Sequence, residues 1–388
     1  MSRPVTPRLG LLTFGHLTID LYSSFFSPLL PLLVQKLHLS LTLVGTLVAL
    51  ASLTSSFSQP LFGLISDRMR RPWFVAFGPL TAAVFMSALG LAPSYGALLA
   101  LLMLAGLGVA AFHPQAAVLA SQVSPRRNVS MAFFITGGTI GFSVGPIFAV
   151  AVVSAVGLER TWVAAIPGVL ASALLLAWFS RVPPRPRHEA RYVPLKELRP
   201  VMRPLSLLYF ATVSRSTVSY GFMTFLPLYL TARGYELSQS GAILSAYLLL
   251  GALGGFCGGW LSDRIGGHRL IVLSFLAAAP LYFGFLVLPD ALGLPCVVLG
   301  SFALQSSLSV NVVLGQELSP RHSSTISSLL MGAAWGMGAL LIGPIGVLAD
   351  HYGLHTALAI NCCRLLVGLT CALMLPGVHR RAMIAEAR

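Results

Sequence analysis

Long apolar runs dominate the pattern of hydrophobic and polar positions along this chain. Most of them are 19 to 28 residues long, and about 20 apolar residues form a helix that crosses the hydrocarbon core of a bilayer. The first run is too long for a cleaved signal peptide and lacks an obvious small-residue cleavage site. We therefore predict an all-α membrane protein with twelve transmembrane helices, at residues 9–34, 41–65, 72–92, 95–123, 129–156, 161–180, 204–231, 238–261, 270–288, 292–316, 323–349 and 354–376.

Composition supports the membrane class, and the distribution of charge predicts an orientation. Of the 388 residues, 56% are hydrophobic and 9% are charged, against about 25% charged residues in soluble proteins. The net charge of +14 would indicate a nucleic-acid partner in a soluble chain. Here twenty of the 25 basic residues fall in loops and termini of one side, three fall on the other side, and Arg215 and Arg364 fall inside spans. Because basic loops stay in the cytoplasm, we predict cytoplasmic termini, a cytoplasmic central loop and no nucleic-acid partner.

The chain contains an internal repeat. The segment Gly63-Leu-Ile-Ser-Asp67-Arg68 recurs as Gly259-Trp-Leu-Ser-Asp263-Arg264, 196 residues later. Three further landmarks recur in the same order at offsets of 195 to 198 residues: Pro31 and Pro227, Ser124-Pro125-Arg126 and Ser319-Pro320-Arg321, and Gly145-Pro146 and Gly343-Pro344. We infer two pseudo-symmetric six-helix bundles, residues 1–181 and 204–388. The Arg- and Pro-rich stretch 182–203 is predicted to be a cytoplasmic linker, either solvated or bound to anionic membrane lipids.

A carboxylate and an imidazole interrupt the first apolar run. Asp20 follows His16 by four residues, so the two side chains share one face of a helix, about 6 Å apart along its axis. Ionisable groups at membrane depth are costly, and they usually face a cavity, a partner or an ion pathway. The pair therefore marks the first candidate for a functional site.

Little in the sequence indicates an enzyme or a receptor. The five cysteines lie in apolar runs at spacings that fit neither a zinc site nor a disulfide framework. The chain has no phosphate-binding loop and no nucleophile with a matched base. Its longest loop is a short linker, which leaves no extramembrane domain for a receptor. We predict a protein that is not an enzyme and that has neither a metal nor a cofactor.

Two parallel six-helix halves joined by a cytoplasmic loop resemble the plan of major facilitator transporters, which bind substrate at the midplane between the halves. Both copies of the Gly-xxx-Asp-Arg segment resemble the loop signature of that superfamily, although Arg70 stands where the first copy usually has glycine. The resemblance implies rocking of the halves, a monomer, and a conformational gate at Gly63, Asp67, Arg68, Arg71, Gly259, Asp263 and Arg264.

A narrower resemblance is to the fosmidomycin-resistance branch of this superfamily. It is carried by His16-xxx-Asp20 with Pro28 and Pro31, by Phe112-His113-Pro114, and by Gly137-Gly138-xx-Gly141-xxx-Gly145-Pro146. This resemblance implies efflux of a small organic or drug-like solute across the inner membrane, driven by the proton gradient. The chain departs from the branch at Gln115, where an acid is common, so Asp20 is predicted to be the only deep carboxylate.

The superfamily plan also selects candidate substrate contacts, because spans 1, 4, 7 and 10 line its central cavity. They are His16, Asp20, His113, Gln115, Arg215, Gln305 and Asn311, among aromatic walls that include Trp335. The repeat offset of 196 residues matches Asp20 with Ser216, and therefore places Asp20 and Arg215 at similar depths. We predict that Asp20 is the proton-coupling site, tuned by His16 and Arg215.

Several alternatives stay open at this stage. His16 could only bond a backbone carbonyl, Asp20 and Arg215 could form a purely structural ion pair, and His113 could bond the backbone that Pro114 frees. A second function is uptake or exchange of an organic anion, in which Arg215 binds the negative group of the substrate through two N–H donors.

Overall fold

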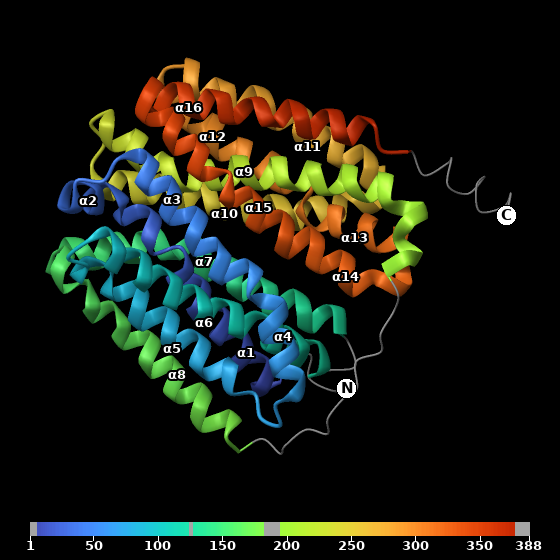
Figure 1. Ribbon diagram of the computed structural model, residues 1–388, viewed down its shortest axis with the longest axis horizontal. Coiled ribbons are helices and arrows are strands. Elements are labelled where there is room, and N and C mark those ends of the chain that lie inside the picture. The colour runs from blue at the N-terminus through green and yellow to red at the C-terminus, as the bar shows by residue number, and fades with distance from the viewer. Residues whose placement is uncertain (1–5, 124–126, 182–194, 377–388) are drawn as a thin grey trace, which may run out of the picture. The chain divides into compact units, whose positions relative to one another are not determined.

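The chain was examined as a computed structural model, which describes residues 6–123, 127–181 and 195–376. Within them the secondary structure is helical and contains no strand. Figure 1 shows the long helices of each part of the chain running roughly side by side. The α-helices are α1 (Pro7–Ser23), α2 (Phe26–Leu37), α3 (Leu41–Ser52), α4 (Gln59–Arg68), α5 (Trp73–Ser87), α6 (Tyr95–Gln122), α7 (Arg127–Val156), α8 (Ala165–Phe179), α9 (Met202–Ala232), α10 (Leu237–Ile265), α11 (Gly267–Val287), α12 (Asp290–Gln305), α13 (Leu308–Leu318), α14 (Ser323–Ser327), α15 (Ala334–Leu340) and α16 (Ile342–Leu373).

Shorter helical turns join or interrupt these helices. The π-helical turns are η1 (Leu53–Phe57) and η6 (Ser328–Ala333), and the 3₁₀ turns are η2 (Ala88–Leu91), η3 (Leu158–Ala164), η4 (Leu195–Val201) and η5 (Pro320–His322). Residues 182–194 of the predicted linker, the repeated Ser124-Pro125-Arg126 segment and the side chain of Asp67 lie outside what the structure describes. The described end of the linker is η4 rather than an open loop.

Ten stretches of the described chain are long and apolar enough to span a membrane. Nine of them each correspond to one predicted span. The tenth, Thr325–Leu373, holds the two predicted spans 323–349 and 354–376, and Gly353 breaks its helical path with a φ of 80°. The remaining predicted span, 204–231, is the continuous helix α9, which is not among the ten because its middle is polar.

The polar middle of α9 is nevertheless compatible with a helix in a low-dielectric environment. The hydroxyl groups of Thr212, Ser216 and Thr217 each donate a hydrogen bond of 2.8 Å to the carbonyl one turn earlier. These bonds satisfy the hydroxyl protons within the helix itself. Polar residues therefore lower the hydropathy of this segment without breaking it.

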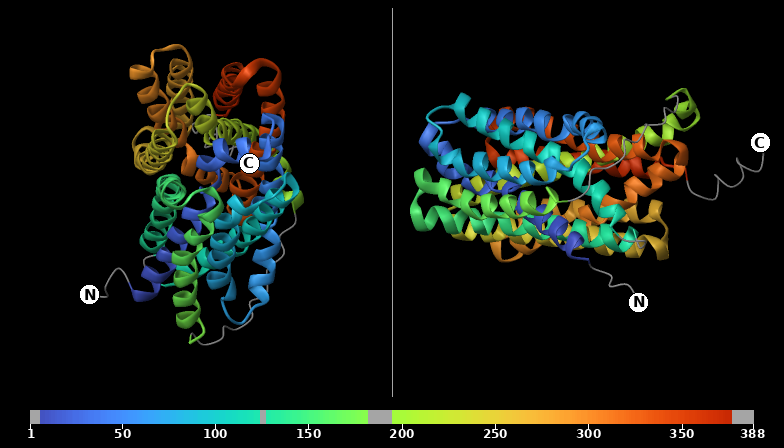
Figure 2. Two further views of the ribbon diagram at one scale, coloured as in Figure 1. Left: turned by 90° about the vertical axis from the view of Figure 1, so that its left-hand side faces the viewer. Right: turned by 90° about the horizontal axis from the view of Figure 1, so that it is seen from below.

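The chain forms two compact units, which are Met1–Ala190 with Met223–Leu249, and Arg191–Phe222 with Leu250–Arg388. The division falls inside α9 and α10. The bundle boundaries predicted from the repeat, 1–181 and 204–388, stay a prediction. Figure 2 shows the same helices from two further directions.

In the first unit, α1 packs on α5, α6, α7 and α8. Its approach to α7 depends on glycines, because a methyl group at Gly141 would overlap the carbonyl oxygen of Leu17. The phenol of Tyr22 fixes α1 to the α8 region, donating to the Ala164 carbonyl at 2.6 Å and accepting from the Gly168 N–H at 3.0 Å. These contacts set the rotation of α1 and hence the direction in which its polar residues point.

The second unit repeats this use of small residues. A methyl group at Gly338 in α15 would lie 2.6 Å from the Cβ of Ser216 in α9. Gly338 follows Gly141 by 197 residues, close to the repeat offset, so corresponding helices meet through corresponding glycines. The close approach of α9 and α15 brings the polar middle of α9 against α15.

Candidate functional site

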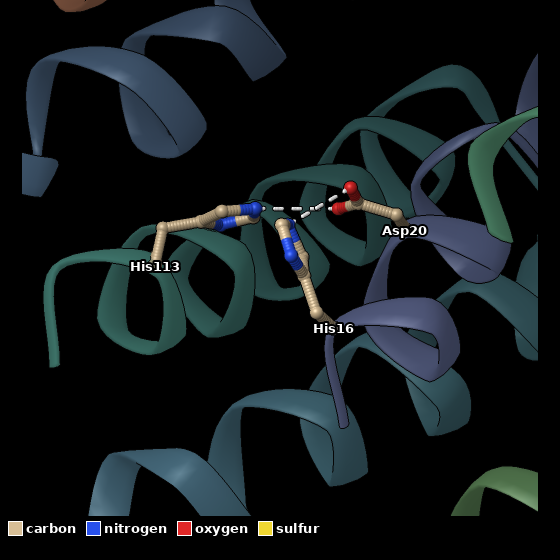
Figure 3. Close-up of side chains that lie close together, drawn as sticks. All are labelled: His16, Asp20 and His113. Atoms are coloured by element: carbon tan, nitrogen blue, oxygen red, sulfur yellow. Dashed lines mark ion pairs between the residues drawn. The ribbon is translucent and has the colours of Figure 1, made fainter. Parts of the chain in front are cut away.

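Two histidines flank one carboxylate in the first unit. In Figure 3, His16 and Asp20 project from α1 and His113 projects from α6 toward the same point. His16 Nε2 lies 3.2 Å from Asp20 Oδ2, and His113 Nε2 lies 3.3 Å from Asp20 Oδ1. Each carboxylate oxygen therefore faces one imidazole. We call these three residues the His–Asp–His cluster.

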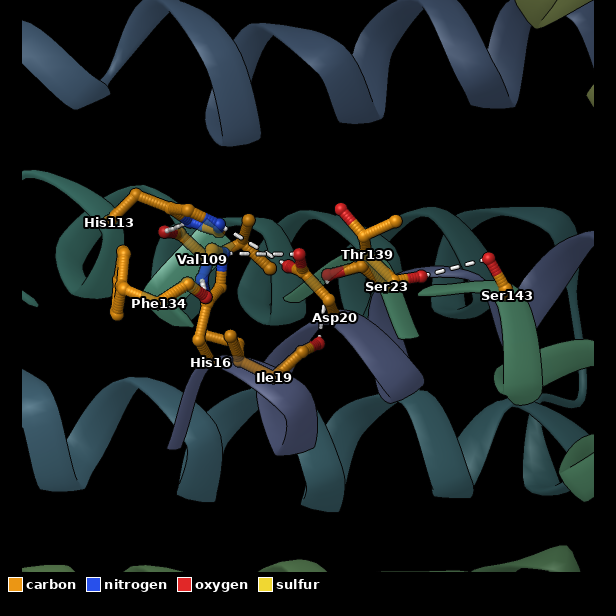
Figure 4. Close-up of polar contacts among 9 residues, drawn as sticks. All are labelled: His16, Ile19, Asp20, Ser23, Val109, His113, Phe134, Thr139 and Ser143. Atoms are coloured by element: carbon orange, nitrogen blue, oxygen red, sulfur yellow. Dashed lines mark hydrogen bonds and ion pairs between the residues drawn. The ribbon is translucent and has the colours of Figure 1, made fainter. Parts of the chain in front are cut away.

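The outer nitrogens of both rings contact backbone carbonyls, as Figure 4 shows. His16 Nδ1 is 2.7 Å from the Phe134 oxygen, and His113 Nδ1 is 2.8 Å from the Val109 oxygen. A carbonyl oxygen only accepts hydrogen bonds, so both Nδ1 atoms carry a hydrogen. In a neutral ring of this tautomer Nε2 is an acceptor, like the carboxylate oxygen that it faces. Each of the two Nε2–carboxylate contacts therefore becomes a hydrogen bond only when a proton is added between the imidazole nitrogen and the carboxylate oxygen.

The surroundings of the cluster are mostly apolar, but the cluster is not sealed. His16 is 7% exposed and stacks on Phe134, with ring centroids 4.1 Å apart. The side chains of Asp20 and His113 are 17% and 27% exposed. A methyl group at Gly138 of α7 would lie 2.6 Å from Asp20 Oδ2 and would overlap His16 Nε2. Glycine at this position therefore lets α7 cover the cluster without displacing it.

The structure refines the sequence-based interpretations of the two histidines. His16 does bond a backbone carbonyl, as the structural alternative expected, and it also contacts Asp20. His113 bonds the Val109 carbonyl, whereas Pro114 lacks the N–H that would bond the carbonyl of Ala110. The structural alternative for His113 thus differs in its partner, which is the Val109 carbonyl and not the carbonyl freed by Pro114. Its pairing with Asp20 was not predicted, because nothing in sequence spacing relates residues on α1 and α6.

Gln115 lies in a different environment from the cluster. Its side chain is buried, accepts a hydrogen bond of 3.2 Å from the Val75 N–H and donates one of 3.0 Å to Ser66 Oγ. These bonds join α6 to the start of α5 and to α4. The predicted role of Gln115 in binding substrate stays a prediction, and its observed bonds are structural.

Arg215 forms a second polar centre, in the second unit. It is fully buried in α9 and its Nη1 donates a hydrogen bond of 2.6 Å to Gln305 Oε1. Its guanidinium carbon lies 5.1 Å from the ring centroid of Trp335, against which Tyr220 packs edge-on at 5.8 Å. From its sequence position Trp335 was predicted only to be an apolar wall, because a lone tryptophan in a span does not indicate a bound cation. Asn311, another predicted contact, is also fully buried.

The predicted gate residues are held in part by local contacts. Arg71 Nη1 donates to the Ser180 carbonyl, and its guanidinium lies 5.9 Å from the Trp73 ring. Arg264 lies 3.7 Å from the Trp260 ring centroid, while Arg68 and Asp263 are exposed. A methyl group added at Gly63 would lie 3.7 Å from Pro114, and one added at Gly259 would lie 3.5 Å from Ser309, both ordinary van der Waals distances. The gating role of this set stays a prediction.

The His–Asp–His cluster also resembles a metal site in its donor set. One ligand atom from each of the three residues lies within 4.8 Å of the other two. The absence of a bound metal therefore stays a prediction, which metal analysis of the purified protein would test.

Comparison with known proteins decides the family. Residues 12–343 match the sequence profile of the Major Facilitator Superfamily. The chain belongs to this superfamily. It is accordingly an integral, multi-pass membrane transporter and not an enzyme.

Individual relatives of the transporter agree with this assignment. It is 29% identical over 354 residues to the fosmidomycin resistance protein of Escherichia coli (strain K12), covering 88% of this chain and 86% of that protein. It is 23% identical over 379 residues to the multi-drug resistance efflux pump PmrA of Streptococcus pneumoniae serotype 4 (strain ATCC BAA-334 / TIGR4), covering 91% and 94%.

A solved structure shares the fold of the transporter. It is a bacterial homologue of the human lysosomal transporter Spinster, in an inward-facing and occupied conformation. The TM-score is 0.80 at 18% identity, over 96% of this chain and 97% of that one. The major facilitator fold predicted from the repeat is confirmed.

Proposed function

We propose that this transporter exports a small organic or drug-like solute across the inner membrane in exchange for protons. Two relatives that align over most of their length are named for drug resistance, one of them as an efflux pump. The excess of basic residues on one side supports cytoplasmic termini. The solute, protons and membrane lipids are its partners, and it works as a monomer without a cofactor.

The observation that carries this proposal is the hydrogen-bond demand of the His–Asp–His cluster. Both Nδ1 atoms already donate to carbonyls, so the contacts of His16 and His113 with Asp20 need added protons. Protonation draws α1 and α6 together at this point, and deprotonation leaves acceptor facing acceptor. A group whose protonation favours one arrangement of helices converts a proton gradient into a conformational bias.

Alternating access follows from rocking of residues 1–181 against 204–388 about a central site. Solute and protons bind this site in opposite orientations of the transporter, which gives exchange. Arg215 remains a candidate for tuning Asp20 during this movement, because the repeat assigns the two residues similar depths.

Proteoliposomes provide the test of coupling. An inward proton gradient should drive solute uphill in the export direction, and a solute gradient alone should move protons, as reported by a pH-sensitive dye inside the vesicles. Fosmidomycin is one member of the compound panel, because a relative is named for resistance to it. Uphill transport that an uncoupler leaves unchanged would exclude proton exchange.

The gate makes a separate prediction. Cysteines introduced into the 66–71 loop and at the cytoplasmic start of span 11, near 323, should stop transport when a short reagent cross-links them. If the reagent forms a reducible disulfide link, a reducing agent should restore transport. Each single-cysteine variant is a matched control, because it reacts with the reagent but cannot be cross-linked. Continued transport in the fully cross-linked protein would rule out a gating role for this loop.

Uptake or exchange of an organic anion is a second candidate function. It is favoured by the fully buried guanidinium of Arg215 on the seventh predicted span. The direction of transport separates the candidates. In cells that lack their own pumps, expression of an exporter lowers accumulation of the solute, whereas expression of an importer raises it.

A further inference from the structure

Arg215 has a positive charge that forms no ion pair with the described residues of its own unit. Its side chain is fully buried, and a guanidinium stays protonated at any physiological pH. Among the residues that the structure describes, its Nε and Nη2 atoms have no hydrogen-bond partner. Buried charges in proteins are normally paired, because the loss of water is otherwise uncompensated. A buried guanidinium with two N–H groups that lack acceptors is therefore suited to bind an anion.

The unsatisfied atoms are those of one edge of the guanidinium group. Gln305 Oε1 accepts a hydrogen bond of 2.6 Å from Nη1, on the other edge. The Nε–H and one Nη2–H point in parallel, and this edge binds carboxylate or phosphate oxygens through two hydrogen bonds. Trp335 lies against the guanidinium face, 5.1 Å from its carbon. The edge is therefore held in place by Gln305 and Trp335, and its two donors remain available.

Asp20 does not require this charge. Each of its carboxylate oxygens already faces an imidazole, at 3.2 Å for His16 and 3.3 Å for His113. When the cluster is protonated, its own histidines neutralise the carboxylate. Asp20 thus has ionic partners within its own unit, whereas Arg215 has no anionic partner among the described residues of its unit.

We propose that the free edge of Arg215 binds the anionic group of the transported solute, and that the solute is an organic carboxylate or phosphonate with an apolar body. This inference rests on the proposed transport function and names the chemical class of its substrate. Ser219, four residues further along the same face of α9, has a buried hydroxyl without a partner in the described structure and supplies an additional donor. The aromatic rings of Trp335 and Tyr220 contact the apolar body.

Binding to the purified full-length transporter in detergent tests this proposal. The probes are arylalkyl carboxylates and phosphonates, each paired with its uncharged amide or ester of the same shape, and the readout is isothermal titration calorimetry. Wild type should bind at least one acid about tenfold or more tightly than its uncharged partner, as expected for two charge-assisted hydrogen bonds. Arg215→Gln should abolish this preference. Arg215→Lys, which keeps the charge but loses the two-donor edge, should weaken binding of the acid about tenfold.

One further variant is the matched control. Arg364→Gln removes the other intramembrane arginine, which is only half-buried, and should bind the acids as wild type does. Equal affinity for acids and their uncharged partners in wild type, or an unchanged preference in folded Arg215→Gln, would overturn the proposal.

The assay contains no membrane and no proton gradient, so its outcome is independent of coupling. Binding that depends on Arg215, together with transport that is insensitive to an uncoupler, would contradict proton exchange and leave the anion site standing. Proton-driven export of solutes without any preference for anions would do the reverse.

Discussion

Asp20→Asn should leave the transporter folded and lower proton-driven export about hundredfold or more. Asparagine has nearly the same shape as aspartate but cannot hold the negative charge that attracts protons to His16 and His113. Loss of two charge-assisted hydrogen bonds, each contributing about 1.5–3 kcal/mol, supports a change of that size. The measurement is the rate of uphill solute transport in proteoliposomes, in the export direction, at a series of external pH values. Wild-type export should increase with the proton gradient, and export by the variant should be flat.

A matched control for Asp20→Asn lies one turn away on the same helix. Ser23 Oγ donates to the Ile19 carbonyl at 2.9 Å, a bond within α1 that Figure 4 also shows. Ser23→Ala should therefore keep both the rate and the pH dependence of export. If Asp20→Asn transported against a gradient as well as wild type, with the same pH dependence, the cluster would not be the coupling site.

Gly141→Ala should destabilise the first unit by about 1–3 kcal/mol, the usual cost of an added methyl group in a packed interface. The new methyl group would overlap the carbonyl oxygen of Leu17 and force α1 and α7 apart. The His–Asp–His cluster lies on α1 and α6, and its His16 bonds the Phe134 carbonyl of α7. Both stability and coupling should therefore decrease. A lower midpoint of thermal unfolding of the detergent-solubilised protein, with a fall in export, is the expected result.

The control for this substitution is an exposed glycine of α1. Gly10 lies in α1, and a methyl group there would meet no atom within 4 Å. Gly10→Ala should be neutral or slightly stabilising, because alanine loses less backbone freedom in a helix. Equal thermal midpoints for Gly141→Ala and Gly10→Ala would show that α1 and α7 do not depend on this contact.

The two proposals assign the binding of protons and the binding of an anionic solute to separate elements of the transporter. The first belongs to the His–Asp–His cluster on α1 and α6, and the second to Arg215 on α9 with Gln305 and Trp335. A solute that carries a negative charge and protons that carry positive charge can therefore be recognised by different residues. Their competition for the transporter then arises from its conformation rather than from a shared binding atom.

Some site residues were predictable and others were not. His16 and Asp20 were found together because a helix brings positions four residues apart onto one face. His113 was found separately, as a polar residue in an apolar span, but its contact with Asp20 was not. Gln115 has the same kind of sequence signal, yet its amide bonds Val75 and Ser66 instead. Polarity within a span marks a residue as noteworthy, and only packing determines which neighbour it meets.

The spans, the repeat and the polar residues that are costly inside a membrane were predictable from the sequence alone. Span length follows from the rise of a helix and the thickness of a bilayer, and both act locally along the chain. The partners of these residues were found only in the folded protein: two histidines for Asp20, Gln305 and Trp335 for Arg215, and two backbone carbonyls that assign the imidazole hydrogens. These depend on the rotation and crossing of helices far apart in the chain, which close contacts at residues such as Gly138 and Gly141 permit.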